Sequence, residues 1–376
     1  MNIPKTSVKP VRLRQLNQAG VNPAGRYVLY WMLSARRPHW NFALQQALDL
    51  ARELGVGLAV FEPLSCDYAF ASDRFHRFVL EGMRDQQQAF AASEVLYYPW
   101  VEASPGQEDE LLQGLAEEAA VVVSDDCPTS SMVRRQQAAA EQLPVALQLV
   151  DGNGLLPLQL VERDYPSAYA LRRLLHRALP AFIDDWPQAD PLADSSLAPA
   201  QLSQQLQGHW PAADLNALLG DAGLKSLPID HQVAPATQVG GSDAGALRIE
   251  EFVQQDLEAY DRLRNIPDLD RTSRLSAYLH YGHVSAHQVF ARLAESENWH
   301  SGRLSLKPTG KRNGWWGLSV AAEAFIDELV TWRELGYGFC RQRPDYADYE
   351  GLPDWARVTL EQHAGDERPY LYSYEQ

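Results

Sequence analysis

The sequence has few cysteines and nothing that would carry it into or across a membrane. Its three cysteines, Cys66, Cys127 and Cys340, are far apart in a chain of 376 residues and form no CxxC pair. This spacing argues against disulfides and indicates a reducing, cytoplasmic environment. No apolar run approaches the roughly 20 residues of a membrane span. Residues 1–6 also lack the apolar segment of a secretory signal, so we expect a cytoplasmic protein without a membrane anchor.

Several motifs that identify enzymes are also missing. The sequence contains no GxGxxG fingerprint, no P-loop and no GxSxG nucleophile elbow. His280 and His283 have no cysteine or carboxylate at metal-ligand spacing, so we expect no metal site. These absences exclude the simplest dinucleotide-binding, nucleoside triphosphatase and hydrolase interpretations.

The charge is strongly negative but unevenly distributed. The net charge of −16 argues against binding of nucleic acid by the surface as a whole. Residues 301–343, however, hold 7 basic and 4 acidic residues, a local net charge of +3. The 45% of apolar residues and 22% of charged residues are ordinary for a globular chain of two or three domains.

The first 150 residues alternate between strand and helix patterns. Near-continuous apolar runs such as 26–33 are typical of strands buried on both faces. The expected strands span 26–33, 56–61, 94–99, 119–124 and 145–150, and the expected helices span 40–54, 74–92, 108–118 and 130–142. This alternation predicts an α/β fold with a doubly wound, Rossmann-like parallel sheet. Ligands usually bind beyond the carboxyl ends of such strands, but a structural domain without a ligand fits these segments equally well.

The rest of the chain predicts helices only. Residues 187–207 are rich in Pro, Ala, Asp, Ser and Gln, as in an exposed connector. Beyond them Ser242 and Ser285 are expected to cap two helices, and 321–340 is expected to form a third. We therefore divide the chain into an α/β domain (1–160), a connector with helical pieces (161–241) and an all-helical domain (242–376).

Three polar or aromatic clusters carry candidate chemistry. Residues 271–276 place three hydroxyls and two guanidiniums before a helix, which suits a phosphate cradle. Glu328 and Trp332 are four residues apart and would share one helix face, where a carboxyl and an indole suit a flat, hydrogen-bonding base. The alternatives are a plain N-cap with solvated arginines, and a surface glutamate beside a core tryptophan.

The third cluster interleaves basic and aromatic residues, a pattern that suits a nucleic-acid surface. Its members are Lys307, Lys311, Arg312, Trp315 and Trp316. A hydrophobic corner beside a solvated loop is the competing interpretation.

Together these segments resemble the photolyase/cryptochrome family, most closely class II cyclobutane pyrimidine dimer photolyases. The specific matches are Thr272–Gly282 (TSRLSAYLHYG) and Glu328–Leu335 (ELVTWREL), with weaker ones at 27–32, 41–44, 121–126, 145–152, 240–244 and 352–356. The resemblance implies an antenna domain at 1–160 and a domain that binds FAD and UV-damaged DNA at 242–376.

The resemblance also implies roles for individual residues. FAD would be contacted by Tyr260, Thr272, Ser273, Arg274, Leu275, Ser276 and Arg333. Glu328 would hydrogen-bond the flipped pyrimidine dimer and Trp332 would pack on it. The implied reaction is light-driven repair by electron transfer from reduced FAD, with the protein supplying orientation and electrostatics. The resemblance also implies a possible second, antenna chromophore, whose identity the sequence does not give. We expect the protein to be a monomer.

One feature departs from that family. Its members continue with further helices past the segment that matches Tyr370–Gln376, and Ser373 and Gln376 form a capping-box pattern at a helix start. We therefore expect a flavin domain that is incomplete at its C-terminus. The chain has two alternative functions besides DNA repair: it is a cryptochrome-like flavin photoreceptor, or it is a truncated photolyase that no longer catalyses a reaction.

Overall fold

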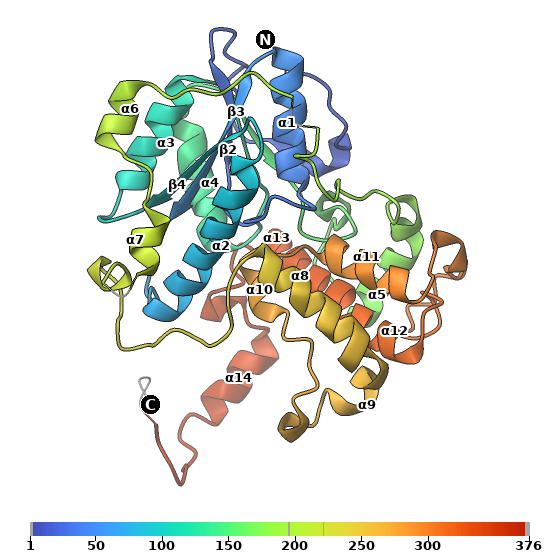
Figure 1. The fold of residues 1–376 in the computed structure, drawn as a ribbon. Coiled ribbons are helices and arrows are strands. Elements are labelled where there is room, and N and C mark those ends of the chain that lie inside the picture. Colours follow the sequence, from blue (N-terminus) through green and yellow to red (C-terminus); the bar gives the residue numbers. More distant parts are fainter. Residues whose placement is uncertain (1–2, 195, 221, 373–376) are drawn as a thin grey trace.

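The computed structural model describes residues 3–194, 196–220 and 222–372, so the capping-box residues Ser373 and Gln376 lie outside the described residues. An α/β domain occupies the upper half of Figure 1 and a helical domain the lower half. The predicted architecture, a Rossmann-like sheet domain followed by helices, is confirmed.

The α/β domain is built on one six-stranded sheet. Its strands are β1 (Leu13–Gln15), β2 (Tyr27–Trp31), β3 (Gly57–Leu64), β4 (Leu96–Val101), β5 (Ala119–Asp125) and β6 (Leu147–Val150). They lie in the order β1-β6-β5-β2-β3-β4, and all neighbours are parallel except β1 and β6. The strand order reverses on either side of β2, which creates a switch point between the ends of β2 and β5.

Alternation along β2 explains how both faces of the sheet are covered. Tyr27, Leu29 and Trp31 pack toward α3 (Gln107–Glu117) and α4 (Ser130–Gln142). Val28 and Tyr30 pack toward α1 (Phe42–Leu54) and α2 (Asp73–Ala91) on the other face. Because both faces are buried, β2 is apolar throughout, as the sequence indicated.

The predicted strands and helices of this domain are all present, with ends shifted by a few residues. Only β1 was not predicted. It has three residues, none of them buried, and it pairs antiparallel with β6 far away in sequence. Such a short edge strand leaves no periodic pattern for a sequence to display.

The segment after the sheet packs against both halves of the molecule. α5 (Ala168–Ala178) buries Leu171 and Leu175 in the core of the helical domain. The short helices α6 (Gln204–His209) and α7 (Leu215–Leu219) return to the α/β domain, where Leu215 packs with α2. Figure 1 shows α6 beside α3 and α7 beside α2, near the β4 edge of the sheet.

The helical domain contains two π-helical turns within longer helices. Its α-helices are α8 (Ser242–Glu251), α9 (Tyr260–Leu263), α10 (Ser276–His280), α11 (Ala286–Ser296), α12 (Val320–Ile326), α13 (Arg333–Gln342) and α14 (Asp354–Gln362). The first π-turn, Phe252–Asp256, follows α8, and the second, Asp327–Trp332, joins α12 to α13. π-Turns are uncommon and frequently lie at functional sites.

The two predicted caps have different outcomes. Ser285 caps α11 by accepting a hydrogen bond from the amide of Gln288 at 2.9 Å. Ser242 does not cap α8, because it is the first helical residue and Gly241 occupies the cap position. Gly241 has a positive φ of 107°, a conformation that glycine adopts without strain.

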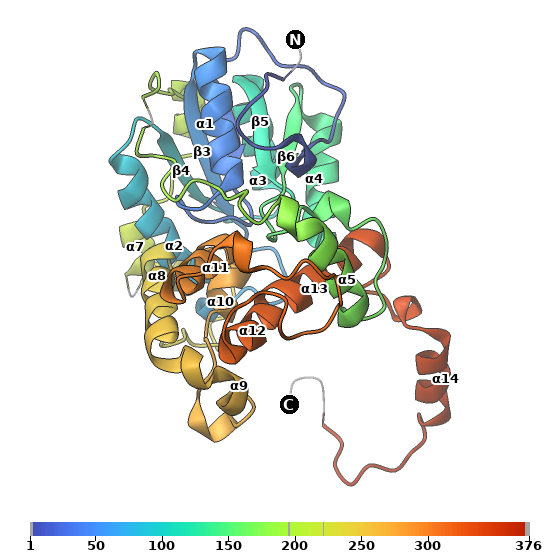
Figure 2. The same cartoon turned by 90° about the vertical axis from the view of Figure 1, so that its right-hand side faces the viewer.

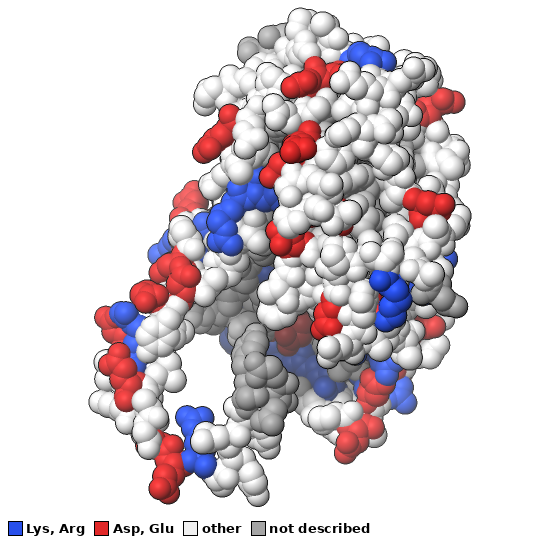
Figure 3. Space-filling view, turned by 90° about the vertical axis from the view of Figure 1, so that its left-hand side faces the viewer, with Lys and Arg blue, Asp and Glu red and all other residues white. Residues whose placement is uncertain are grey.

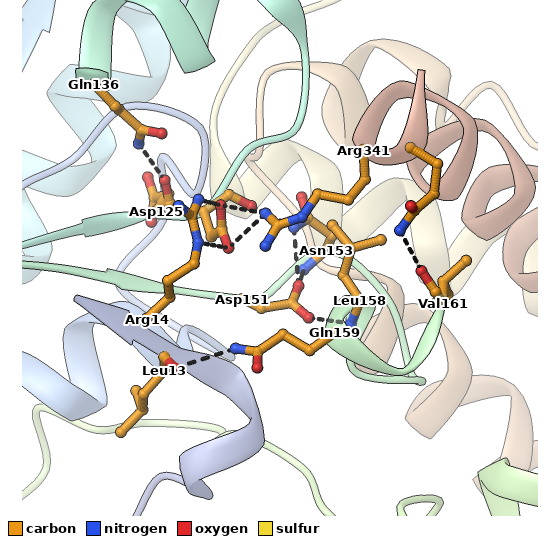
Figure 4. Close-up of polar contacts among 12 residues, drawn as sticks. Leu13, Arg14, Asp125, Gln136, Asp151, Asn153, Leu158, Gln159, Val161 and Arg341 are labelled. Carbon is orange, nitrogen blue, oxygen red and sulfur yellow. Dashed lines mark hydrogen bonds and ion pairs between the residues drawn. The ribbon is translucent and has the colours of Figure 1, made fainter. Parts of the chain in front are cut away.

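Polar contacts join the two domains along α13 and the loop before α11. Arg341 of α13 forms an ion pair with Asp126, just after β5, while Gln342 fixes α13 to the connector by donating to the carbonyl of Val161 (Figure 4). Arg37 donates to the carbonyl of Gly282 at 2.9 Å. A Cβ at Gly282 would lie 1.7 Å from the carbonyl oxygen of Ser34, so only glycine allows the two backbones to meet here.

α14 projects away from the rest of the protein (Figure 2). Its side chains Trp355, Val358 and Leu360 are all exposed. Figure 3 views the face on the side of α6 and α7, where acidic and basic side chains are intermixed and the segment carrying α14 extends from the body. Among the described helices, none has the length and apolar character needed to cross a bilayer.

Candidate functional site

A cavity of about 310 Å³ in the helical domain brings the predicted polar motifs together. Its lining consists of Tyr260, Ser273, Ser276, Leu279, His280, Phe325, Glu328, Leu329, Arg333 and Tyr337. Five of these were predicted from the sequence to act in cofactor or substrate binding. We call this space the helical cavity.

Hydroxyl groups of the segment before α10 form one wall of the helical cavity. Ser273 and Ser276 both line it, and the hydroxyl of Ser273 accepts from the amide of Leu275 at 3.3 Å. Burial raises the pKa of Tyr260, so its phenol stays protonated and can donate a hydrogen bond. Leu275 is fully buried, so only its backbone can serve a ligand.

An arginine network outside the cavity holds this segment in place. Arg248 donates to the carbonyl of Ser273 at 2.9 Å and also forms an ion pair with Asp256 of the first π-turn. Arg271 binds the other oxygen of Asp256 at 2.7 Å. Arg271 therefore supports the loop through Asp256.

Two residues of the predicted phosphate cradle do not reach the cavity. Thr272 is exposed and is absent from the lining. Arg274 is exposed too, and its guanidinium forms an ion pair with Asp270. Their predicted contacts with a cofactor stay predictions.

The second π-turn carries Glu328 into the opposite wall. Its carboxylate lines the cavity and forms an ion pair with Arg264 at 2.8 Å. Glu328 and Trp332 both lie on this π-turn, whose hydrogen bonds run from residue i to i+5, and their predicted common helix face stays a prediction. Trp332 is 50% exposed and does not line the helical cavity.

Arg333 faces the helical cavity without a partner for part of its guanidinium. Its Nε is buried and has no hydrogen-bond partner among the described residues. Its guanidinium lies 4.6 Å from the centre of the Tyr337 ring, one turn along α13. A buried, unpaired donor on a cation is a favourable contact point for an anionic or carbonyl-bearing ligand.

A second cavity, of about 710 Å³, lies between the two domains. We call it the interdomain cavity. It opens at the switch point, with residues 33–37 after β2 and 125–127 after β5 in its wall, and it shares Leu279, His280, Arg333 and Tyr337 with the helical cavity. Its volume lies within the range of about 300–1,000 Å³ that is usual for small-molecule sites.

Two arginines on the α/β side of the interdomain cavity, Arg36 and Arg135, are paired with carboxylates. Arg36 forms an ion pair with Glu62 at 2.9 Å, and burial raises the pKa of Glu62 although Arg36 opposes the shift. Arg135 pairs with Glu108. One oxygen of Asp125 accepts from three consecutive amides, those of residues 33–35. A ligand on the α/β side of this cavity would therefore meet Arg36 and Arg135 already paired.

The structure corrects part of the predicted nucleic-acid surface. Lys307, Lys311 and Arg312 are exposed, as a phosphate-binding surface requires. Trp315 and Trp316 are only 1% and 4% exposed and belong to the helical core, so the prediction that they contact DNA is wrong. The indole of Trp315 stacks on His176 of α5, with ring centres 4.2 Å apart.

Sequence reasoning missed Arg264, His280 and Tyr337. The spacing of Tyr260 and Arg264, one helical turn apart, was the available signal for a cation placed near the ring, and the guanidinium lies 5.3 Å from the ring centre. His280 was considered only as a metal ligand. Within the described ranges no cluster of three histidines, cysteines or carboxylates could hold a metal ion.

No family model matches the chain, but its sequence relatives include three that agree in name. Each is called deoxyribodipyrimidine photo-lyase. The protein of Methanothermobacter thermautotrophicus is 26% identical over 96% of this chain and 72% of its own length. The Arabidopsis thaliana protein is 26% identical, covering 98% and 71%, and that of Oryza sativa subsp. japonica is 28% identical, covering 97% and 68%.

A solved structure agrees in fold. A class III photolyase from Agrobacterium tumefaciens superposes with a TM-score of 0.59 at 16% identity, covering 90% of this chain and 66% of that one. The sequence matches to deoxyribodipyrimidine photo-lyases thus extend over nearly the whole chain, and a photolyase structure shares its fold.

Proposed function

We propose that the chain repairs cyclobutane pyrimidine dimers in UV-damaged DNA, with FAD as its redox cofactor. The observation that carries the proposal is the helical cavity, in which Ser273 lies in one wall while Glu328 and Arg333 come from a second segment far away in sequence. The name of the relatives, deoxyribodipyrimidine photo-lyase, supports the same activity.

The donors around the helical cavity fit FAD. Hydroxyls and backbone amides near a helix start are suited to a pyrophosphate. Tyr260, Ser273 and Ser276 supply hydroxyls, while the buried Nε of Arg333 offers a charged donor. When bound, reduced FAD would supply the light-driven electron transfer that splits the dimer.

Glu328 and Trp332 would act on the damaged base. The carboxylate of Glu328 can accept from a ring N–H, and the ion pair with Arg264 restricts its orientation. The half-exposed indole of Trp332, on the same π-turn, offers an apolar face to a base that has left the duplex. A dimer is easier to extrude than an intact pair, because its pairing and stacking are already weakened.

We also assign a second, antenna chromophore to the interdomain cavity. The cavity lies at the switch point of the sheet, where ligands of such folds usually bind. It shares the side chains of Leu279 and Tyr337 with the helical cavity, so its ligand would lie beside the cofactor.

The test combines an absorption spectrum with a repair assay. The purified chain should show flavin absorbance and should repair a dimer-containing oligonucleotide in light but not in darkness. Glu328→Gln should lower repair about 10- to 100-fold with flavin absorbance unchanged, since a hydrogen bond involving a charged group contributes about 1.5–3 kcal/mol. Glu53→Gln, at an exposed position of α1, is the matched control.

Two outcomes would reject the proposal. Absence of both flavin and repair would indicate a chain without catalysis. Flavin binding with equal affinity for damaged and intact DNA, and no repair, would instead indicate a photoreceptor.

A further inference from the structure

The turn that follows β6 is held by two buried charged side chains from different parts of the chain. Arg12 is 0% exposed and donates to three backbone carbonyl oxygens, those of residues 151, 154 and 155. Glu334 of α13 holds the amides instead, because its Oε1 accepts from Leu155 at 2.7 Å and from Leu156 at 3.3 Å. We call the turn 151–156 together with Arg12 and Glu334 the junction clamp.

The carboxyl group of Glu334 is enclosed by the turn. A Cβ at Gly154 would lie 2.6 Å from Oε1 of Glu334, so glycine is needed for the turn to come this close. The second carboxyl oxygen, Oε2, is buried and has no hydrogen-bond partner among the described residues. Loss of a proton from this group therefore places a charge where water does not reach it, which is costly.

The charged groups around Glu334 do not offset a negative charge there. Asp151 opposes ionisation of Glu334, and Arg12 favours it but already forms an ion pair with Asp185 at 3.2 Å. His287 of α11 also lies near Arg12, and burial lowers its pKa well below the usual range, so it stays neutral. Burial is the largest influence on Glu334 and raises its pKa to about 8, so the group is protonated at pH 7.

α13 connects the junction clamp to the helical cavity. Glu334 directly follows Arg333, which lines both cavities. The far end of α13 is fixed separately, through the contacts of Arg341 and Gln342 with the other domain and the connector. The near end follows the π-turn at 327–332, and its hydrogen bonds to the turn 151–156 come from Glu334. Release of Glu334 would therefore free the half of α13 that carries Arg333.

We propose that Glu334 is a positioning residue whose proton regulates ligand binding in the helical cavity. With the proton bound, the junction clamp is closed and holds Arg333 in the cavity wall. When the proton passes to water, the negative charge beside Asp151 favours an open clamp, in which water reaches the carboxylate and the start of α13 moves. This inference rests on the proposed function for its choice of FAD as the ligand.

The direction of the pH effect follows from the raised pKa of Glu334. In an open clamp the carboxyl group meets water, and its pKa returns toward 4.5. Between this value and about 8 the closed clamp binds one proton more than the open clamp, so closing is favoured at low pH and weakens as the pH rises. One linked proton changes the equilibrium constant for closing by at most about tenfold per pH unit.

The first experiment follows the junction clamp without a ligand. Hydrogen exchange of the amides of Leu155 and Leu156 is measured by mass spectrometry between pH 6.5 and 8.5 and corrected for the intrinsic exchange rate. Their protection should fall with rising pH in the parent protein, by at most about tenfold per pH unit. Glu334→Gln can still accept from both amides but does not titrate, so its protection should stay constant. Glu53→Gln, at an exposed position of α1, should behave like the parent protein.

The second experiment measures FAD affinity by fluorescence over the same pH range. Affinity should fall with rising pH in the parent protein and change less in Glu334→Gln. His280, an exposed imidazole in the cavity wall, is present in both proteins, so any effect of its charge is common to them.

A glycine variant tests the junction clamp without changing a titratable group. Gly154→Ala places a Cβ against Glu334 and should bind FAD about 2- to 30-fold more weakly than the parent protein at pH 6.5, the range usual for residues that couple distant sites. Gly336→Ala, at an exposed position of α13 where a Cβ meets nothing within 4 Å, should keep the parental affinity.

The outcomes separate this inference from the proposed function. Equal pH dependence of FAD affinity in the parent protein and in Glu334→Gln would overturn the inference, while FAD binding itself would support the proposed cofactor. Gly154→Ala with a lower free energy of unfolding but parental FAD affinity would show that the clamp serves the fold alone, which also overturns it. If FAD binds at no pH, the proposed function fails, and the exchange measurement still decides whether the clamp opens when the proton is lost.

Discussion

The two cavities lie side by side but differ in how their charges are arranged. Around the interdomain cavity, Arg36 is paired with Glu62 and Arg135 with Glu108. In the helical cavity, Arg333 keeps a buried Nε without a protein partner. The interdomain cavity thus has paired arginines on its α/β side, whereas Arg333, on the side that it shares with the helical cavity, keeps a donor for a ligand.

This difference predicts which substitutions change the stability of the fold and which change ligand affinity. A buried charge that loses its partner destabilises the fold strongly, whereas an unpaired donor in a site lowers stability only until a ligand satisfies it. We therefore expect substitution of the paired groups on the α/β side of the interdomain cavity to affect folding, and substitution of Arg333 to affect ligand affinity.

The largest effect is expected at Glu62. Glu62→Ala would leave the buried guanidinium of Arg36 unpaired and remove the acceptor used by Tyr97 and Gln86. Loss of one partner of a buried ion pair typically lowers the free energy of unfolding by about 3–5 kcal/mol. Urea denaturation at pH 7 measures it, with Glu53→Ala on the exposed face of α1 as the control. If Glu62→Ala lowered the free energy of unfolding no more than the control does, the ion pair between Arg36 and Glu62 would not stabilise the fold.

The next effect is expected at Arg333, which lines both cavities. Arg333→Ala should lower flavin affinity about 10- to 100-fold, because a charged hydrogen bond contributes about 1.5–3 kcal/mol. Its free energy of unfolding without ligand should change little, since the buried Nε has no protein partner among the described residues. Titration with FAD followed by fluorescence measures the affinity, and Arg134→Ala is the control. If Arg333→Ala instead lowered the free energy of unfolding and left flavin affinity unchanged, Arg333 would serve the fold rather than a ligand.

The smallest effect is expected from Glu334, which faces the domain junction beside Arg333. Its carboxylate is buried and accepts from the amides of Leu155 and Leu156, and burial raises its pKa from 4.5 to about 8. Between these values the folded state binds the extra proton, so the free energy of unfolding should fall as the pH rises, by at most about 1.4 kcal/mol per pH unit.

Glu334→Gln removes this titration while its carbonyl oxygen can still accept from both amides. Urea unfolding at pH 5.5, 6.5 and 7.5 should therefore show a flatter pH dependence for the variant than for the parent protein. Glu53→Gln, at an exposed position, should keep the parental slope. Equal slopes for all three proteins would show that Glu334 does not hold its proton in the folded state.

The helical cavity was predictable to the extent that its residues lie in short motifs. Ser273, Ser276 and Glu328 stand at local spacings that a sequence displays directly. For the interdomain cavity, the sequence predicted only where it lies, beyond the carboxyl ends of the strands, and not the contacts in its wall. Its ion pair between Arg135 and Glu108 joins two separate helices, and no local pattern encodes such a contact.

The error at Trp315 and Trp316 has a different physical cause. An aromatic pair after basic residues has the same local pattern whether the rings face solvent or the core. What decides is the site for stacking that His176 offers from α5, far away in the sequence. The π-turns were likewise invisible, because the apolar spacing of 321–340 fits one continuous α-helix.

A π-turn corresponds to an α-helix with one inserted residue, and the turn at Asp327–Trp332 has a consequence for tolerance to deletion. Removal of a single residue there could be absorbed by reversion to ordinary α-helical winding, so the flanking helices would keep their register. What would be lost is the arrangement by which adjacent carboxylates, Asp327 and Glu328, reach Arg172 of α5 and Arg264 just after α9. The inserted residue thus lets one helix form two separate ion pairs without a break in the chain.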